Sequence, residues 1–353
     1  MANAKTFFER KDIEVSVKRY AIDALSSMAF GLFASLVIGL IIKTIGEQIG
    51  LRAGESSFSL FLVTIGTTAM AMIGPAIGIA VAHSLKAPSL VLFASAVTGY
   101  MGAMAWTEGG AAGGPAGAFV AVLVGAEIGK MVSKETKVDI IVTPLVTIFV
   151  GGVVARLVGP LVGALMTGLG NVIMTATDLQ PFWMGIIVAI IVGLVLTGPI
   201  SSAALCIMLS LSGLAAGAAT VGCCSHMIGF AVISFKANGV GGLFAQGLGT
   251  SKLQLPNAIK NPWILVPPTL SSAILGPFAT VVFKMTNIPA GAGMGTSGFV
   301  GQIGTFTAMG FSFDTLWKVI LLQYALPAIL SFLIYVLFKK LGKIKDEDLK
   351  LPL

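Results

Sequence analysis

The chain has 353 residues, of which 56% are hydrophobic and only 10% are charged, and its net charge is +7. A soluble chain of this length would form about two domains, each with roughly 25% charged residues. This composition excludes an ordinary soluble fold. In a membrane protein, an excess of Lys and Arg marks cytoplasmic loops rather than a nucleic-acid site.

Long stretches without any formal charge recur along the chain, namely 24–42, 87–107, 261–283 and 319–338. Each is near or above the roughly 20 residues that a helix needs to cross a bilayer. The stretches lack the alternation of a transmembrane barrel, so helices are the remaining way to satisfy their backbone groups in lipid. The sequence predicts an all-α polytopic membrane protein.

Apolar runs and their polar flanks predict about ten membrane spans. The fifth span is too long for one straight crossing, and it is expected to kink or break at Pro144, Gly151, Gly152, Gly159 and Pro160. The stretch 199–219 is also interrupted by glycine and proline. The predicted spans are 20–45, 57–82, 88–106, 115–132, 138–173, 182–199, 202–217, 219–235, 263–285 and 316–339.

Basic residues predict the orientation of the chain. They cluster before the first span and after the last, at 5–19 and 339–350, whereas the loops at 107–114 and 174–181 have no Lys or Arg. Because basic residues favour the cytoplasmic side, both termini are expected in the cytoplasm, which requires an even number of spans.

Three glycine-rich segments are too broken for plain helices: 107–117, 237–262 and 286–310. Irregular backbone at membrane depth is tolerated where it lines a polar cavity, and transporters build solute sites from such segments. Segment 286–310 has no charge, which favours a re-entrant hairpin over a solvent loop. For 107–117, an ordinary loop and a re-entrant segment remain equally open.

Ionisable residues inside the membrane are candidate functional residues. His226 lies in an apolar span, and a neutral imidazole offers one donor and one acceptor to a sugar hydroxyl. It is equally compatible with a packing histidine bonded to a neighbouring helix. Glu108 could accept hydrogen bonds from a solute, although a place at the outer interface fits it better.

Uncharged polar residues gather in the two C-terminal irregular segments. Amides and hydroxyls there suit a neutral solute with many hydroxyl groups, but they also suit helix caps. The candidate substrate-binding residues are His226, Glu108, Asn238, Gln246, Asn261, Thr296, Ser297 and Gln302.

Other chemistry finds little support in the sequence. There is no GxxxxGK[ST] loop, no metal-ligand spacing and no evident catalytic residue, so neither a cofactor nor a metal is expected. The cysteines at 206, 223 and 224 lie in apolar segments and do not indicate a disulfide framework.

The run from GPISSAAL at 198 through CCSHMIGF, KANGVGGLFAQGLGTSKLQLPNAIKNP and GAGMGTSGFVGQIG resembles the EIIC membrane proteins of the bacterial sugar phosphotransferase system. Within that family it is most similar to the branch of the perfringolysin regulator PfoR. The resemblance covers nearly the whole chain and is most specific between about 198 and 310.

The resemblance implies a ten-helix homodimer in the bacterial cytoplasmic membrane, with two re-entrant hairpins in each copy. It implies four parts: a cytoplasmic segment at 1–19, scaffold and dimerisation helices at 20–175, a substrate-binding transport domain at 176–340 and a cytoplasmic tail at 341–353. His226 matches the family's sugar-binding histidine. The family's glutamate, in an NEP-like motif of the second hairpin, has no counterpart in GTSGFVGQIG.

These features predict a permease subunit that binds a small, sugar-like solute and moves it by alternating access. Phosphotransferase activity requires separate EIIA and EIIB phosphocarrier proteins, because this chain has no phosphocarrier domain. The alternative is a membrane sensor derived from such a permease, without net transport, and the missing acid motivates it.

Overall fold

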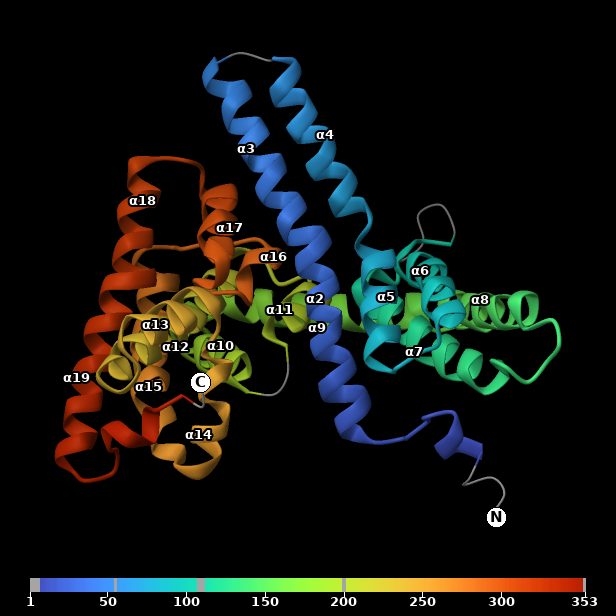
Figure 1. Cartoon of the computed structure of the whole chain (residues 1–353). Helices are drawn as coiled ribbons and strands as arrows, with labels where there is room; N and C mark the ends of the chain where they lie inside the picture. Colours follow the sequence, from blue (N-terminus) through green and yellow to red (C-terminus); the bar gives the residue numbers. More distant parts are fainter. Residues whose placement is uncertain (1–6, 54–55, 107–111, 199–200, 352–353) are drawn as a thin grey trace. The chain divides into compact units, whose positions relative to one another are not determined.

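The computed structural model describes residues 7–53, 56–106, 112–198 and 201–351. Contacts divide the chain into two compact units, Met1–Gly168 and Leu169–Leu353, whose elements are labelled in Figure 1. Within the described residues, backbone pairing outside helices is limited to one isolated bridge between Gly213 and Asn287. The prediction of an all-helical protein is confirmed.

Among the described residues, the first unit contains seven helices of eight or more residues and the beginning of another. A continuous helical segment of 34 residues, Lys18–Leu51, opens the unit. The helices are α2 (Leu25–Leu32), α3 (Ile38–Ala53), α4 (Ser57–Ala71), α5 (Ile73–Ser84), α6 (Ser89–Ala103), α7 (Gly114–Val132), α8 (Asp139–Leu157) and α9 (Gly159–Leu179), of which α9 ends in the second unit.

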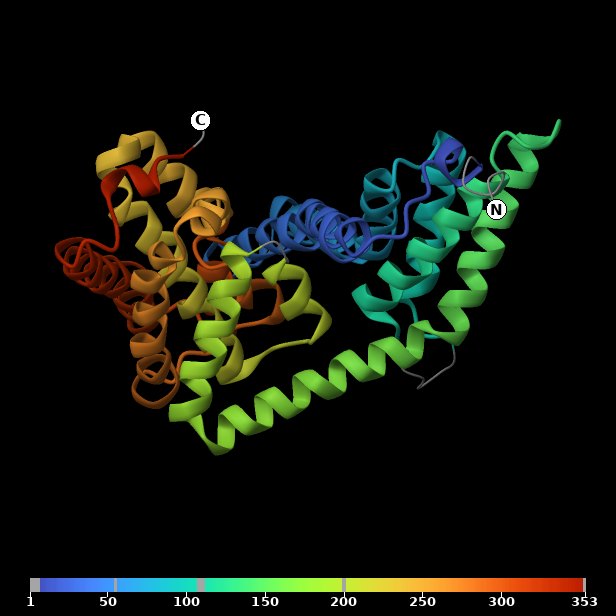
Figure 2. The same ribbon diagram turned by 90° about the horizontal axis from the view of Figure 1, so that it is seen from below.

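Two breaks in this unit follow from its prolines. Helices α4 and α5 are bent by 49°, because Pro75 has no N–H to donate to the carbonyl four residues earlier. The predicted fifth span divides at Val158 into α8 and α9, as Gly159 and Pro160 indicate. The change of direction between α8 and α9 is visible in Figure 2.

Buried charge stabilises one end of the first unit. Lys130 is only 1% exposed, and its Nζ donates to the carbonyls of Asp12 and Leu85, at 2.7 and 2.8 Å. Its Nζ also lies 3.0 Å from the Glu127 carboxylate. Leu85 ends α5, so the cation also complements the negative end of that helix.

The second unit is built around α12 (Gly213–Ile233), and 89% of the most apolar 18-residue window of α12 is buried. The corresponding fraction is only 17% for α9, so α12 is the central helix of this unit. The other helices are α10 (Pro181–Thr197), α11 (Ser202–Met208), α13 (Phe235–Phe244), α14 (Leu255–Lys260), α15 (Val266–Pro277), α16 (Pro289–Ala292), α17 (Val300–Met309), α18 (Phe313–Val319) and α19 (Leu326–Lys340).

The predicted span at 202–217 is wrong. Helix α11 has seven residues, Ser210 adopts a positive φ, and Gly213, also at positive φ, begins α12. Helix α12 then continues through 217–219, where the sequence predicted a break between two spans. The glycines and alanines there serve close packing rather than a turn.

Helices α10 and α12 run in the same direction. Gly222 lies against Ala189, and four residues further along each helix His226 lies against Gly193. Because α10 and α12 are parallel, the chain must return along α10 between them, and α11 lies within this return.

Seven helices of the described residues are long and apolar enough to cross a membrane, or eight if the α4–α5 pair is one span. Two shorter apolar helices, α6 and α10, bring the set of apolar segments to ten. The structure thus has seven or eight candidate spans where the sequence predicted about ten, and 202–217 is not among them.

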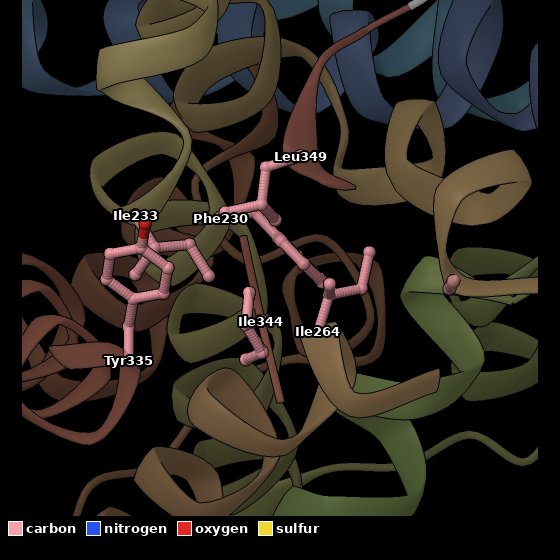
Figure 3. Packing of buried hydrophobic residues seen from close by; sticks show 7 residues of the cluster. Phe230, Ile233, Ile264, Tyr335, Ile344 and Leu349 are labelled. Atoms are coloured by element: carbon pink, nitrogen blue, oxygen red, sulfur yellow. The ribbon is translucent and has the colours of Figure 1, made fainter. Parts of the chain in front are cut away.

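The C-terminal tail belongs to the core of the second unit. Ile344 and Leu349 are 1% and 0% exposed, and they pack with Phe230, Ile264 and Tyr335 (Figure 3). The segment that the sequence predicted as a cytoplasmic tail therefore contributes side chains to the hydrophobic core.

Candidate functional site

The middle of α12 carries a band of polar groups inside the second unit. His226, Ser225 and Thr220 are all fully buried. Small residues allow this: a Cβ atom at Gly222 would lie 2.7 Å from the Cα of Ala189, so a larger side chain would push α10 away. Close helix packing therefore excludes water around α12 and leaves its polar groups to one another.

His226 lies in a small network of hydroxyl groups. Its Nδ1 is 2.9 Å from the Oγ1 of Thr197 at the end of α10, and that hydroxyl is 2.8 Å from the Oγ of Ser251. On the other edge of the ring, Nε2 is 3.4 Å from the Oγ1 of Thr269 on α15. Since a hydroxyl can donate or accept, either neutral tautomer of the ring is accommodated.

The 3.4 Å distance between His226 Nε2 and Thr269 Oγ1 is at the long limit of hydrogen bonding. A ligand hydroxyl that approached Nε2 at an ordinary distance would therefore replace a weak bond with a stronger one. Of the two ring nitrogens, Nε2 is the better placed to exchange its partner for a solute.

A helical hairpin formed by α16, the 3₁₀ turn Ser297–Phe299 and α17 packs on the same face of α12. Its tip contains three consecutive sharp turns, with positive φ at Gly295, Gly298 and Phe299. Glycine is needed at 295 for a second reason, because a Cβ there would meet the backbone of Cys223 at 2.9 Å. The glycines of 286–310 thus bring the tip against the middle of α12.

Asn287 holds the base of this hairpin. Its Nδ2 donates to the Oγ1 of Thr220, at 2.6 Å, and to the carbonyl of Gly301, at 2.9 Å. Its Oδ1 accepts from the N–H of Ile288 at 2.8 Å. These bonds join the hairpin to α12 and make Asn287 a structural residue of the site.

Gln302 lies in the hairpin stretch GTSGFVGQIG, which contains no glutamate. Its Nε2 donates to the Oε1 of Gln323, at 2.8 Å, and lies 3.7 Å from the Sγ of Cys224. Its own Oε1 is buried and has no hydrogen-bond partner. A buried amide oxygen without a partner costs free energy, so this atom is a ready acceptor for a hydroxyl group.

The first irregular segment reaches the same place. Residues 235–260 form α13, a π-helical turn at Ala245–Gly249, a 3₁₀ turn at Ser251–Gln254 and α14. The hydroxyl of Thr296, at the tip of the second hairpin, donates to the carbonyl of Gly247 and also contacts the Sδ of Met227. The two irregular segments therefore meet beside α12.

Three of the predicted substrate-binding residues belong to or contact four residues of α12, Cys224–Met227, although Cys224 and His226, two positions apart, point to nearly opposite sides of the helix. His226 is on α12 itself, Thr296 contacts Met227, and Gln302 contacts Cys224. Ser297 follows Thr296 at the hairpin tip and is half-buried. We refer to this place as the α12 polar centre.

The amide side chains of segment 237–262 contact the C-terminal tail rather than the α12 polar centre. Asn238 and Gln254 donate to the carbonyl of Leu349, at 2.8 and 2.9 Å. Asn261 donates to the Lys343 carbonyl and to the Asp348 carboxylate. Gln246 joins this group by accepting from the Nε2 of Gln254 at 2.8 Å. Asn238, Gln246 and Asn261 thus belong to a ladder of amides that holds the C-terminal tail.

Two residues of the α12 polar centre escaped the sequence analysis. Thr197 and Ser251 are the hydroxyls nearest to the Nδ1 edge of His226, and no local pattern distinguishes them from other Thr and Ser residues. The only signal was their position at the borders of irregular segments. Glu108, the remaining predicted residue, lies outside the described residues.

Among the described residues, no group of His, Cys, Asp and Glu side chains is arranged to hold a metal ion. Cys206, Cys223 and Cys224 are free buried thiols.

Apolar helices that are long enough to cross a membrane, with buried polar side chains between them, define a multi-pass membrane protein. A family model described as "Phosphotransferase system, EIIC" matches residues 22–351, nearly the whole chain. The chain therefore belongs to the EIIC family, the membrane permease components of the bacterial sugar phosphotransferase system. No curated protein and no solved structure matches it.

Family membership places this multi-pass protein in the bacterial inner membrane. It also implies a sugar as the class of substrate and the EIIA and EIIB proteins as partners.

Proposed function

We propose that this chain binds a sugar-like solute at the α12 polar centre and carries it across the membrane by alternating access. The observation that carries the proposal is the buried hydroxyl network around His226, beside the stretch Cys224–Met227 that Thr296 and Gln302 contact. A neutral imidazole, a hydroxyl and an amide carry no charge, and together they offer both donors and acceptors.

The chemistry favours hydroxyl groups over ions. A carboxylate or a phosphate would need a cation, and a metal ion or a proton-coupled mechanism would need acids. Segment 286–310 has no charged side chain. The cation next to Ser251, Lys252, donates to the carbonyl of Gly198 at 2.6 Å. A neutral solute whose hydroxyls both donate and accept matches the centre best.

In the present arrangement the polar groups bond mainly to one another. Solute entry would exchange the long His226–Thr269 contact and would supply a partner for the Oε1 of Gln302. The hairpin tips at 247–251 and 295–299 would separate from α12 during each cycle. Such irregular segments at a solute site are a common transporter design.

We further propose that segments 237–262 and 286–310 are re-entrant hairpins, that both termini face the cytoplasm and that the protein acts as a homodimer. The basic clusters at the two ends of the chain support the orientation. In this proposal the second unit is the transport domain and the helices before it form the scaffold.

Proteoliposomes containing the purified protein test this proposal by counterflow of radiolabelled sugars and polyols. We expect exchange of at least one neutral sugar, and loss of that exchange in His226→Ala. Protein-free liposomes and His83→Ala liposomes are the controls. Absence of exchange and of binding for every sugar, polyol and sugar phosphate would contradict the proposal.

A second function is a membrane sensor without net transport. It is favoured by GTSGFVGQIG, which has Gln302 but no acid that could assist phosphoryl acceptance, and by the resemblance to a regulator branch. Binding of a sugar without counterflow would identify this function. Flux in the same proteoliposomes would exclude it.

A further inference from the structure

A groove of about 620 Å³ opens where the ends of α12 and α19 meet the C-terminal tail. It lies apart from the α12 polar centre. Its lining combines apolar side chains, among them Phe235, Phe332 and Val336, with the lysines Lys236, Lys339 and Lys340. A groove with both apolar and cationic lining fits an amphiphile with an anionic head.

The groove has a surplus of positive charge. The only acid that lines it is Asp346 of the tail. This carboxylate lies 2.6 Å from Lys339 and 3.1 Å from Lys236, and it accepts from the Tyr335 hydroxyl. Lys340 makes no ion pair with any residue that the structure describes. Three lysines against one carboxylate leave a net charge of +2 for an outside anion.

The lysines are accessible to such an anion. The side chain of Lys236 is 76% exposed and that of Lys339 is 40% exposed. Both lysines and Lys340 lie at the ends of apolar helices, which is the depth of the lipid headgroups. The Asp346 carboxylate shows that an oxyanion fits between Lys236 and Lys339 in this geometry.

Exposed apolar side chains continue from the groove along α19. Phe332, which lines the groove, is 46% exposed, and the neighbouring Leu333 and Leu337, outside the groove lining, are 59% and 55% exposed. An acyl chain that followed this exposed face would leave its headgroup beside the lysines.

We propose that this groove binds an anionic glycerophospholipid, with its phosphate between Lys236 and Lys340 and its acyl chains along Phe332 and the exposed face of α19. Basic pockets between helix ends are typical binding places for such headgroups. The site is independent of solute transport, so it stands even if the α12 polar centre binds no sugar.

The test is a lipid titration of the full-length protein in detergent, followed by native mass spectrometry. Phosphatidylglycerol, phosphatidylcholine with the same acyl chains, and inorganic phosphate are the three probes. We expect phosphatidylglycerol to bind about tenfold or more tightly than phosphatidylcholine, because each lysine near a headgroup favours the anion. Inorganic phosphate, which lacks acyl chains, should bind far more weakly than the lipid.

The variant Lys236→Gln/Lys340→Gln should weaken phosphatidylglycerol binding about tenfold or more and leave phosphatidylcholine binding unchanged. Lys343→Gln/Lys345→Gln is the matched control, because it removes the same charge from the same end of the unit but outside the groove. Lys236→Arg/Lys340→Arg keeps the charge and should retain binding.

Three results would overturn the proposal. One is equal affinity for the two lipids, which the wild-type protein alone decides even if the Gln variant does not fold. Another is an equal loss of binding in the control variant, which would indicate a diffuse surface charge. The third is binding of inorganic phosphate as tight as that of the lipid, which would assign the groove to a soluble anion.

Discussion

The Nδ1 atom of His226 lies 2.9 Å from the hydroxyl oxygen of Thr197, and a second hydroxyl, that of Ser251, lies 2.8 Å beyond it. This relay joins three segments that are distant in sequence: α12, the end of α10 and the first irregular segment. A change in the hydrogen bonding of His226 on solute binding would therefore reach the segment that contacts the second hairpin.

Thr197→Val tests the relay. The substitution keeps the shape of the side chain but leaves His226 Nδ1 and the Ser251 hydroxyl without their shared partner. We expect the free energy of unfolding in detergent to fall by about 1–3 kcal/mol, the usual result of leaving buried polar groups unpaired. Thr64→Val is the control, because Thr64 is exposed and bonds only to the carbonyl four residues earlier. Equal stability of both variants would refute the relay.

Gln302→Leu tests the unpaired amide oxygen. The variant removes the proposed hydroxyl acceptor, so we expect the Kd for the transported sugar to rise about tenfold, which corresponds to about 1.4 kcal/mol. Isothermal titration of the purified protein measures this change. Gln180→Leu, at an exposed position, should bind as the wild type does. If Gln302→Leu binds sugar with unchanged affinity, Gln302 has no place in the site.

Gly222→Ala tests the close packing of α10 and α12. The new methyl group would lie 2.7 Å from the Cα of Ala189, so the helices must separate, and we expect a loss of about 1–3 kcal/mol of stability. Gly168→Ala is the matched control within a helix, because no atom lies within 4 Å of its added Cβ. It should be neutral or slightly stabilising. A tolerated Gly222→Ala with unchanged sugar binding would contradict the packing argument.

We expect the stability of the C-terminal tail to depend on pH through the ionisation of Asp346. Hydrogen bonds from Lys339 and Tyr335 lower the pKa of this carboxyl from its ordinary value of 3.8. A lowered pKa in the folded state means that the stabilisation is complete above the ordinary value and is lost as pH falls through the lowered one. Protection of the amide of Leu351, which bonds to Asn238, should be constant between about pH 8 and pH 5 and fall only below about pH 4.

Hydrogen–deuterium exchange, corrected for the intrinsic rate at each pH, measures this protection. Asp346→Asn should reduce it at neutral pH, whereas Glu347→Gln should not, since Glu347 makes no ion pair with a described residue. A loss of protection that begins near pH 6 would point to a group other than Asp346.

The sequence predicts most of the helices of this fold because charge-free runs and their polar ends are local signals. Gly159 and Pro160 mark a real break, whereas Pro144 stands inside α8 without ending it. The same reasoning failed at 202–219, where Gly217, which looked like part of a turn, instead lets α12 pass close to the backbone of Met285. Glycine occurs both in turns and where two backbones pack closely. The sequence alone does not show which neighbour a given glycine packs against.

The site was predictable only in part. His226 stands out because an ionisable residue in an apolar span is rare. Asn238 and Asn261 have the amide groups expected of residues that bind a sugar. Instead, Asn238 donates to the Leu349 carbonyl and Asn261 to the Asp348 carboxylate, both in the tail. These contacts join residues about a hundred positions apart, and no local pattern in the sequence reveals them. The core positions of Ile344 and Leu349 were missed for the same reason.

The most direct test of the account is a thermal-shift titration of the wild-type protein and of His226→Ala against sugars, polyols and their phosphates. We predict that at least one neutral sugar stabilises the wild type and that His226→Ala abolishes this shift while remaining folded. The same shift in both proteins, or stabilisation by phosphorylated compounds alone, would contradict a neutral-solute site at His226.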